Sequence, residues 1–282
     1  MAAPKLTAAL TWATFENAIL TVLRDALGRL SGVAQLPRAE EPINLELYWL
    51  MRQAHLDHTR AKAKGMMQFL ILFDCNSQPE PDDAARAQRL RKRPDFNCAI
   101  MNPQAPDHRT SQVNYYIECK RLGEAEGAWV LNDNYSEHGV NRFVHADWQY
   151  AKGYSTATMV GYVQNSVPAT ILTEVNAGAT TRNFPSLAIA ATSWAARGVN
   201  TLIQSPLTRG FLPSPFALGH LWVDLCHCTF VATTQTPPAA ATAPPPTPKA
   251  KPATPKKPAA KKTVVKKAAK NTAAKARPKK PR

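Results

Sequence analysis

The sequence lacks any long uncharged apolar run. No stretch of its 282 residues approaches the roughly 20 consecutive apolar residues that a membrane-spanning helix requires. The short apolar run near the N-terminus is interrupted by Glu16 and Asn17 before the core of a signal peptide develops. We therefore expect a soluble, cytoplasmic protein with no membrane partner.

Cysteine is scarce. The five cysteines are odd in number and scattered, and most lie in apolar, strand-like runs. Small disulfide scaffolds instead carry dense, paired cysteines. This pattern argues against a disulfide framework and favours buried thiols in a reducing compartment.

Acidic residues are absent after Asp224. Residues 249–282 hold 14 of the 35 basic residues, so residues 1–248 hold the other 21 together with all 20 acidic ones. The formal net charge of +15 therefore belongs almost entirely to the C-terminal segment. The charge of the remaining chain is close to neutral and gives no argument for or against nucleic-acid binding.

The C-terminal segment has two parts. Residues 232–248 are rich in Pro, Ala and Thr, which predicts an extended linker. Residues 249–282 repeat paired lysines among alanines and prolines and resemble the basic tails of linker histones and bacterial DNA-associated proteins, so we expect a disordered tail. Such a tail would bind DNA through counterion release and associate with a bacterial nucleoid, although nuclear import or solubility are alternative roles. The paired lysines are Lys256, Lys257, Lys261, Lys262, Lys266 and Lys267.

Residues 1–231 carry the hydrophobic patterns of one globular domain. Helical and strand-like patterns alternate along this part, which predicts an α/β (α+β) fold with a mixed central sheet flanked by helices. The predicted helices are 11–32, 40–60, 136–151 and 168–178. The predicted strands are 69–73, 96–101, 113–119, 156–164, 199–205 and 218–232.

Charged residues flank two of these predicted strands. Asp95 precedes one strand, and Glu118 and Lys120 end the next, on the same face because successive side chains alternate. If the two strands pair as a hairpin, Asp95 lies close to Glu118. Two converging carboxylates repel each other unless a cation joins them, and hard oxygen ligands suit Mg²⁺ or Mn²⁺. The main-chain carbonyl of Cys119 could supply a third oxygen.

Lys120 would lie beside such a metal ion. There its amine could orient or deprotonate a water molecule and stabilise negative charge on a phosphate. This arrangement suits metal-assisted hydrolysis of phosphodiester bonds. The structural alternative is that Asp95 caps a turn while Glu118 and Lys120 form a surface pair.

The same residues carry a resemblance to a known family. Pro94 and Asp95, followed by Glu118, Cys119 and Lys120 at a strand end, resemble the core motif of the PD-(D/E)xK nuclease superfamily, which has the restriction-endonuclease-like fold. The resemblance implies a mixed sheet flanked by helices, one or two Mg²⁺ ions, and cleavage of DNA or, less often, RNA. It also implies that Asp95 and Glu118 are metal ligands and that Lys120 orients the water.

The resemblance covers about residues 40–165. Many members of the family add a glutamate from the preceding helix, and here Glu41 and Glu46 are the candidates. We favour Glu41, because a helix N-terminus can direct a carboxylate at the site. Glu46 would have to lie on the inward face of the helix, among leucines.

The predicted function is therefore a Mg²⁺-dependent endonuclease acting on duplex DNA. Restriction or anti-phage defence is the setting that we favour, and repair and mobile-element roles are alternatives that fit the same chemistry. Arg121, Arg142 and Lys152 could contact phosphates, although a solvated side chain is the alternative for each arginine. Family members often dimerise, so the resemblance also allows a homodimer. The alternative function is a non-catalytic DNA-associated binding protein built on a degenerate nuclease fold.

Overall fold

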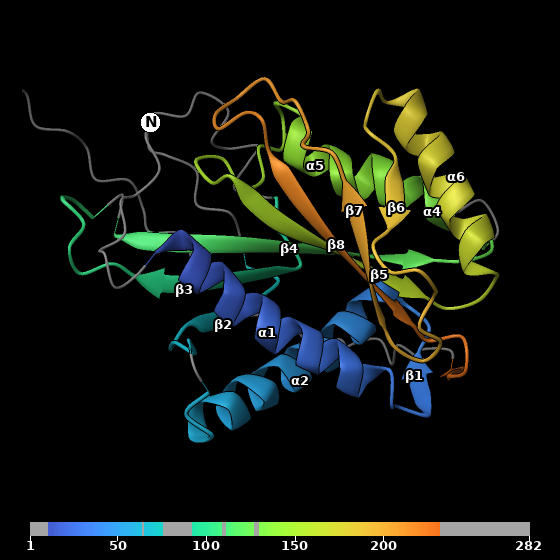
Figure 1. Cartoon of the computed structure of the whole chain (residues 1–282), viewed down its shortest axis with the longest axis horizontal. Helices are drawn as coiled ribbons and strands as arrows, with labels where there is room; N and C mark the ends of the chain where they lie inside the picture. Colours follow the sequence, from blue (N-terminus) through green and yellow to red (C-terminus); the bar gives the residue numbers. More distant parts are fainter. Residues whose placement is uncertain (1–10, 64, 76–91, 109–110, 127–129, 232–282) are drawn as a thin grey trace, which may run out of the picture. The chain divides into compact units, whose positions relative to one another are not determined.

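The computed structural model describes residues 11–63, 65–75, 92–108, 111–126 and 130–231. Within these ranges the chain forms a mixed α/β fold, with helices on both faces of a seven-stranded sheet (Figure 1). This confirms the predicted mixed α/β class with a mixed central sheet. The predicted linker and the basic tail, with all the paired lysines named above, lie outside the described residues.

The sheet combines parallel and antiparallel strands. Its members are β2 (Leu70–Phe73), β3 (Phe96–Met101), β4 (Gln112–Leu122), β5 (Thr156–Val163), β6 (Leu187–Ile189), β7 (Val199–Gln204) and β8 (Ala217–Asp224). Their spatial order is β2-β3-β4-β5-β8-β7-β6, with β4, β5 and β8 parallel to one another and the outer pairs antiparallel. Two short strands, β1 (Gln35–Pro37) and β9 (Thr229–Val231), pair in parallel beside it.

Two long helices cover one face of the sheet. They are α1 (Trp12–Leu30) and α2 (Glu40–Arg60), in close agreement with the prediction. Thr11 caps α1 by accepting a hydrogen bond from the main-chain nitrogen of Thr14 at 3.1 Å. The apolar stripes of both helices pack against the odd-numbered side chains of β4, including Cys119. None of the helices in the described ranges combines the length and apolar composition needed to span a lipid bilayer.

Shorter helices cover the opposite face. They are α4 (Leu131–Asn134), the π-helix η1 (Tyr135–Val140), α5 (Asn141–Val144) and α6 (Pro168–Thr181). The prediction of one helix over 136–151 was wrong in its bounds, because η1 widens the helix and α5 ends at Val144. Gly139 lies in η1, where an added Cβ would overlap Met159 and lie 3.3 Å from Lys120 Cγ. The missing side chain therefore lets this helical segment approach β4 and β5 closely.

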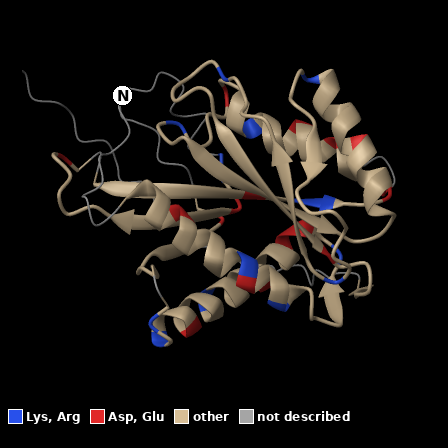
Figure 2. Cartoon of the chain, in the orientation of Figure 1, with Lys and Arg blue, Asp and Glu red and all other residues tan. Residues whose placement is uncertain are grey.

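Charged residues are rare inside the sheet. Most of the length of the strands is tan in Figure 2, and charged residues are concentrated on helices and loops. Within the seven-stranded sheet, the charged residues are Glu118, Lys120 and Arg121 near the end of β4 and Asp224 at the end of β8. Burying a charge costs free energy unless a partner compensates it. The charged side chains near the end of β4 must therefore have partners of opposite charge or a bound ion.

Candidate active site at the open edge of strand β4

The site is built where β3 separates from β4. Pairing between the two strands ends at Phe96 and Ile117. Strand β4 continues to Leu122 and is paired there with β5 on its other side only. The main-chain groups of Cys119 and Arg121 that face the β3 side are therefore left without a strand partner within the described sheet.

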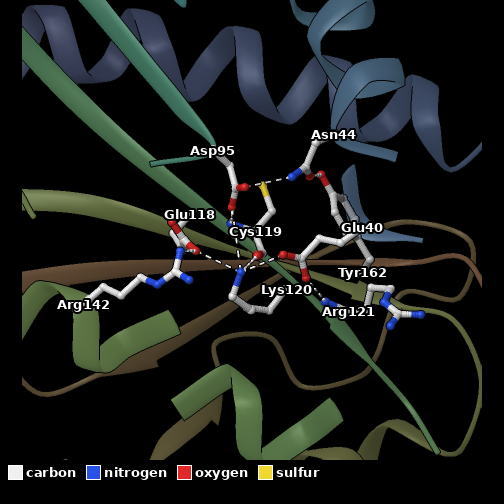
Figure 3. Close-up of polar contacts among 9 residues, drawn as sticks. All are labelled: Glu40, Asn44, Asp95, Glu118, Cys119, Lys120, Arg121, Arg142 and Tyr162. Carbon is white, nitrogen blue, oxygen red and sulfur yellow. Dashed lines mark hydrogen bonds and ion pairs between the residues drawn. The ribbon is translucent and has the colours of Figure 1, made fainter. Parts of the chain in front are cut away.

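Two carboxylates occupy this open edge (Figure 3). The main-chain nitrogen of Cys119 donates to Asp95 Oδ2 at 2.6 Å, and that of Arg121 donates to Glu40 Oε2 at 3.2 Å. Asp95 comes immediately before β3, and Glu40 is the first residue of α2, where the helix dipole favours a carboxylate. The end of a hairpin and a helix N-terminus thus meet at one stretch of β4.

Lys120 lies at the centre of the cluster. Its Nζ is 2.7 Å from Glu40 Oε1, 2.8 Å from Glu118 Oε1 and 4.0 Å from Asp95 Oδ2, and it donates to the carbonyl of Cys119 at 2.6 Å. Glu118 is fully buried and only 8% of the Lys120 side chain is exposed. The structure therefore brings Asp95, Glu118 and Lys120 together, and it contradicts the alternative of a surface pair.

A second layer of hydrogen bonds fixes the orientation of Asp95. Asn44 Nδ2 donates to Asp95 Oδ1 at 3.0 Å, and the Tyr162 hydroxyl donates to Asn44 Oδ1 at 2.7 Å. Asn44 and Tyr162 are both buried. Each oxygen of Asp95 therefore has a donor, one from the main chain and one from a side chain.

The glutamate contributed by α2 is Glu40, and this corrects the expectation of Glu41 or Glu46. Glu41 is exposed, and Glu46 is half-buried further along the helix. The inward stripe of α2 passes through Asn44 and Leu47, and Glu40 lies one turn before Asn44 on that stripe. Helical periodicity in the sequence could have identified Glu40, whereas Glu41 is rotated by about 100° from it.

The three predicted phosphate contacts have different surroundings. A nitrogen of the Arg142 guanidinium, Nη1, donates to Glu118 Oε1, so Arg142 belongs to the cluster. Arg121 instead forms an ion pair with Glu126 at 2.8 Å. Lys152 is exposed in a turn after α5. Of the three, the structure brings only Arg142 into contact with Glu118.

The charges in the cluster shift one another. Burial and the neighbouring Glu118 carboxylate raise the pKa of Asp95 well above its ordinary value, although the Lys120 ammonium opposes this shift. Burial alone would lower the pKa of Lys120, but the carboxylates of Glu118, Asp95 and Glu40 outweigh burial and raise it. Lys120 therefore remains an ammonium ion, and the cluster favours additional positive charge.

The oxygen atoms here fit a hard divalent cation. Across the described ranges, no three His, Cys, Asp or Glu side chains are grouped as a metal-binding cluster. The candidate ligands are the carboxylates of Asp95 and Glu118 and the carbonyl of Cys119, which are the ligand types that Mg²⁺ and Mn²⁺ prefer. The Asp95 oxygens and the Cys119 carbonyl already accept hydrogen bonds, so a cation would have to displace some of these donors. Glu118 Oε2 is buried and has no hydrogen-bond partner. A carboxylate oxygen without a partner at a fully buried position is a suitable ligand for such a cation.

Comparisons with known proteins add no assignment to this geometry. The chain matches no protein-family model, no curated protein and no solved structure. The functional interpretation therefore depends on the chemistry of the cluster at the open edge of β4.

Proposed function

We propose that this chain is a Mg²⁺- or Mn²⁺-dependent endonuclease that hydrolyses phosphodiester bonds in DNA, with a restriction-endonuclease-like fold. One observation supports this most strongly. The buried Glu118 carboxylate, the Asp95 carboxylate and the Lys120 ammonium converge at one strand edge, with a carboxylate oxygen that has no partner. A cluster of this kind is costly in a sheet and is typical of a functional site.

Asp95, Glu118 and the Cys119 carbonyl would hold the metal ion. When bound, a divalent ion stabilises negative charge on the phosphate and lowers the pKa of a water molecule. Lys120 remains protonated, and its three hydrogens are directed at Glu40, Glu118 and the Cys119 carbonyl. A metal ion held by Glu118 and the Cys119 carbonyl would free the ammonium to orient the attacking water and to stabilise a phosphoryl oxygen. The water oxygen forms a bond to phosphorus, the phosphorus–oxygen bond to one sugar breaks, and the water proton passes to that leaving oxygen.

Other residues in the cluster position these groups. Glu40 holds the Lys120 ammonium at 2.7 Å, and Asn44 holds the Asp95 carboxylate at 3.0 Å. The Tyr162 hydroxyl fixes the amide of Asn44 at 2.7 Å, so that its amino group faces Asp95. These contacts limit the rotation of the groups that act directly, which is a requirement for efficient catalysis.

The test is nicking of supercoiled plasmid by the full chain with Mg²⁺. The informative variants are Asp95→Asn and Lys120→Met, and Asp74→Asn is the control because Asp74 is an exposed carboxylate paired with Arg93. We expect each informative variant to lose about 100-fold or more in rate, and Asp74→Asn to cut normally. Calorimetric titration with MnCl₂ should show binding that Asp95→Asn weakens. Equal residual cutting by all the proteins would indicate a contaminant and contradict the proposal.

A specific observation also favours the non-catalytic alternative. The Lys120 ammonium already lies within hydrogen-bond distance of two carboxylates, Glu40 and Glu118, and offsets part of their charge without a metal ion. A DNA-associated binding protein could keep such a cluster as a structural element. Under this alternative the chain would bind DNA in the same assay, leave the plasmid intact, and show no heat of binding with MnCl₂.

A further inference from the structure

Three buried polar atoms without partners belong to residues around one carboxylate. They are Glu118 Oε2, Arg142 Nε and the Tyr150 hydroxyl, all of which are shielded from solvent in the described structure. A buried polar atom without a hydrogen bond destabilises the folded state, because it has lost its hydrogen bonds to water. One such atom could be incidental, but three in neighbouring residues point to a missing ligand.

The three residues are neighbours in space. Arg142 donates to Glu118 Oε1 through Nη1, and the central carbon of its guanidinium is 6.0 Å from the centre of the Tyr150 ring. The same carbon lies 4.5 Å from the centre of the Trp148 ring, which covers the guanidinium. Burial and the Glu118 carboxylate raise the pKa of Tyr150, so its hydroxyl keeps its proton and can donate it in a hydrogen bond.

These atoms have complementary chemistry. Arg142 Nε and the Tyr150 hydroxyl are both donors, so together they suit an anionic oxygen. Glu118 Oε2 is an acceptor and suits a cation. A phosphodiester bound beside a divalent ion would supply the anionic oxygen to the two donors and leave Glu118 Oε2 to the cation.

We propose that Arg142 and Tyr150 form the subsite for a non-bridging oxygen of the scissile phosphodiester. This inference rests on the proposed nuclease function and names two residues that lie outside the motif. The Arg142 side chain is 21% exposed, but its Nε and the Tyr150 hydroxyl are shielded from solvent. Entry of a phosphate therefore requires the Trp148 ring, which covers the guanidinium, to move aside. The two hydrogen bonds would stabilise charge on the phosphate during hydrolysis.

A buried arginine holds the segment that carries the subsite. Arg209 Nη1 donates to the carbonyls of Phe143 and Tyr150 at 3.5 and 3.4 Å, and its Nη2 donates to those of Ala151 and Tyr154 at 3.2 and 2.7 Å. Burial lowers the pKa of Arg209 to about 10. Holding a buried guanidinium against main-chain carbonyls is costly, and here it fixes the backbone of Tyr150. Arg209 is therefore a positioning residue for the subsite.

The first measurement is the single-turnover rate of plasmid nicking with Mg²⁺. Tyr150→Phe removes only the hydroxyl. Arg142→Gln removes the positive charge and the N–H donors of the guanidinium group. The control is Tyr116→Phe, which also removes one tyrosine hydroxyl. The Tyr116 ring stacks on the Tyr150 ring, with the centroids 6.5 Å apart. We expect both subsite variants to cut about 10- to 100-fold more slowly and Tyr116→Phe to cut at the normal rate.

The second measurement does not depend on cleavage. The thymidine dinucleotide pTpT is titrated calorimetrically into each full-length protein in EDTA, where the basic tail is the same in every variant. We expect Tyr150→Phe and Arg142→Gln to bind about fivefold more weakly or worse, and Tyr116→Phe to match the parent. Parent-like nicking and binding by Tyr150→Phe would overturn the subsite and leave only a buried water site. An inactive parent with selective loss of binding in the variants would instead contradict the nuclease proposal and support the subsite.

Discussion

The Lys120 ammonium lies 2.8 Å from the carboxylate of Glu118, two residues earlier on the same strand. Strand alternation alone places the two side chains on one face. The ammonium also meets Glu40, which is 80 residues distant in the sequence and lies 2.7 Å away. One strand thus carries both a buried acid and its counterion, and α2 supplies a further carboxylate that fixes the counterion.

The first prediction concerns the stability of this cluster. Lys120→Met should lower the free energy of unfolding by about 3–5 kcal/mol, because it leaves the buried Glu118 carboxylate without one of its two cations. Added MgCl₂ should restore part of the loss in Lys120→Met, since a divalent ion can replace the missing charge. Urea unfolding at neutral pH, with and without MgCl₂, measures both effects.

The control for that prediction is Lys152→Met. Lys152 is exposed, so the same substitution there should change the free energy of unfolding by about 0.5 kcal/mol or less. Equal losses in the two variants would show that the cluster contributes nothing specific to stability. A loss in Lys120→Met that MgCl₂ does not reduce would argue against a cation site.

The second prediction concerns two glycines in helical segments. Gly139→Ala should lower the free energy of unfolding by about 1 kcal/mol, because the new methyl group would overlap the end of the buried Met159 side chain and force it to repack. Gly28→Ala in α1 should instead raise it by about 0.5–1 kcal/mol, because Gly28 is exposed with no neighbour in the way. Urea unfolding should therefore show that the free energy of unfolding falls in Gly139→Ala and rises in Gly28→Ala. A change of the same sign in both variants would contradict the close approach of η1 to Met159 on β5.

The third prediction is a pH dependence that arises from His220. This residue is buried between the Tyr135 hydroxyl at 2.8 Å and Gln204 Oε1 at 3.1 Å, and burial lowers its pKa from 6.5 to about 3. Below pH 6.5 the unfolded chain binds a proton that the folded chain does not. Stability should therefore fall as the pH falls from 6.5 toward 3, by about 2 kcal/mol at pH 5 from this residue.

His220→Gln provides the comparison for that prediction. This variant should be less stable than the parent at neutral pH, because it disturbs a packed site. Its stability should nevertheless change less steeply between about pH 6.5 and about pH 4. Urea unfolding across this range measures how the free energy of unfolding of each protein changes with pH. If the two proteins show the same pH dependence, protonation of His220 does not cause the predicted loss of stability.

Much of the fold and part of the candidate site follow from local patterns. Strand alternation predicts the shared face of Glu118 and Lys120, and hairpin geometry predicts that Asp95 lies near them. Glu40 and Asn44 were missed, although the apolar stripe of α2 passes through both positions. Tyr150 lies near a predicted strand and could contact a nucleic-acid backbone on that ground alone. Its place beside Glu118 and Arg142 depends on contacts with distant segments that no local periodicity encodes.

The fourth prediction concerns the basic tail and depends on the sequence alone. Changing the six paired lysines between 256 and 267 to glutamine in the full chain should reduce the salt dependence of DNA binding. Each lost phosphate contact should reduce the slope of log K against log salt by about 0.9. Fluorescence anisotropy with a labelled duplex at several salt concentrations gives the slope. An unchanged slope would show that these lysines make no phosphate contacts.

The open edge of β4 has a consequence for how the site tolerates change. Asp95 and Glu40 are held there by the main-chain nitrogens of Cys119 and Arg121, and Lys120 also uses the carbonyl of Cys119. Peptide groups are the same whatever side chain follows them. Substitution of the half-buried Arg121 by any residue except proline therefore leaves its anchor for Glu40 intact. Cys119 is buried in the core, so its anchor for Asp95 persists only with a replacement of similar volume.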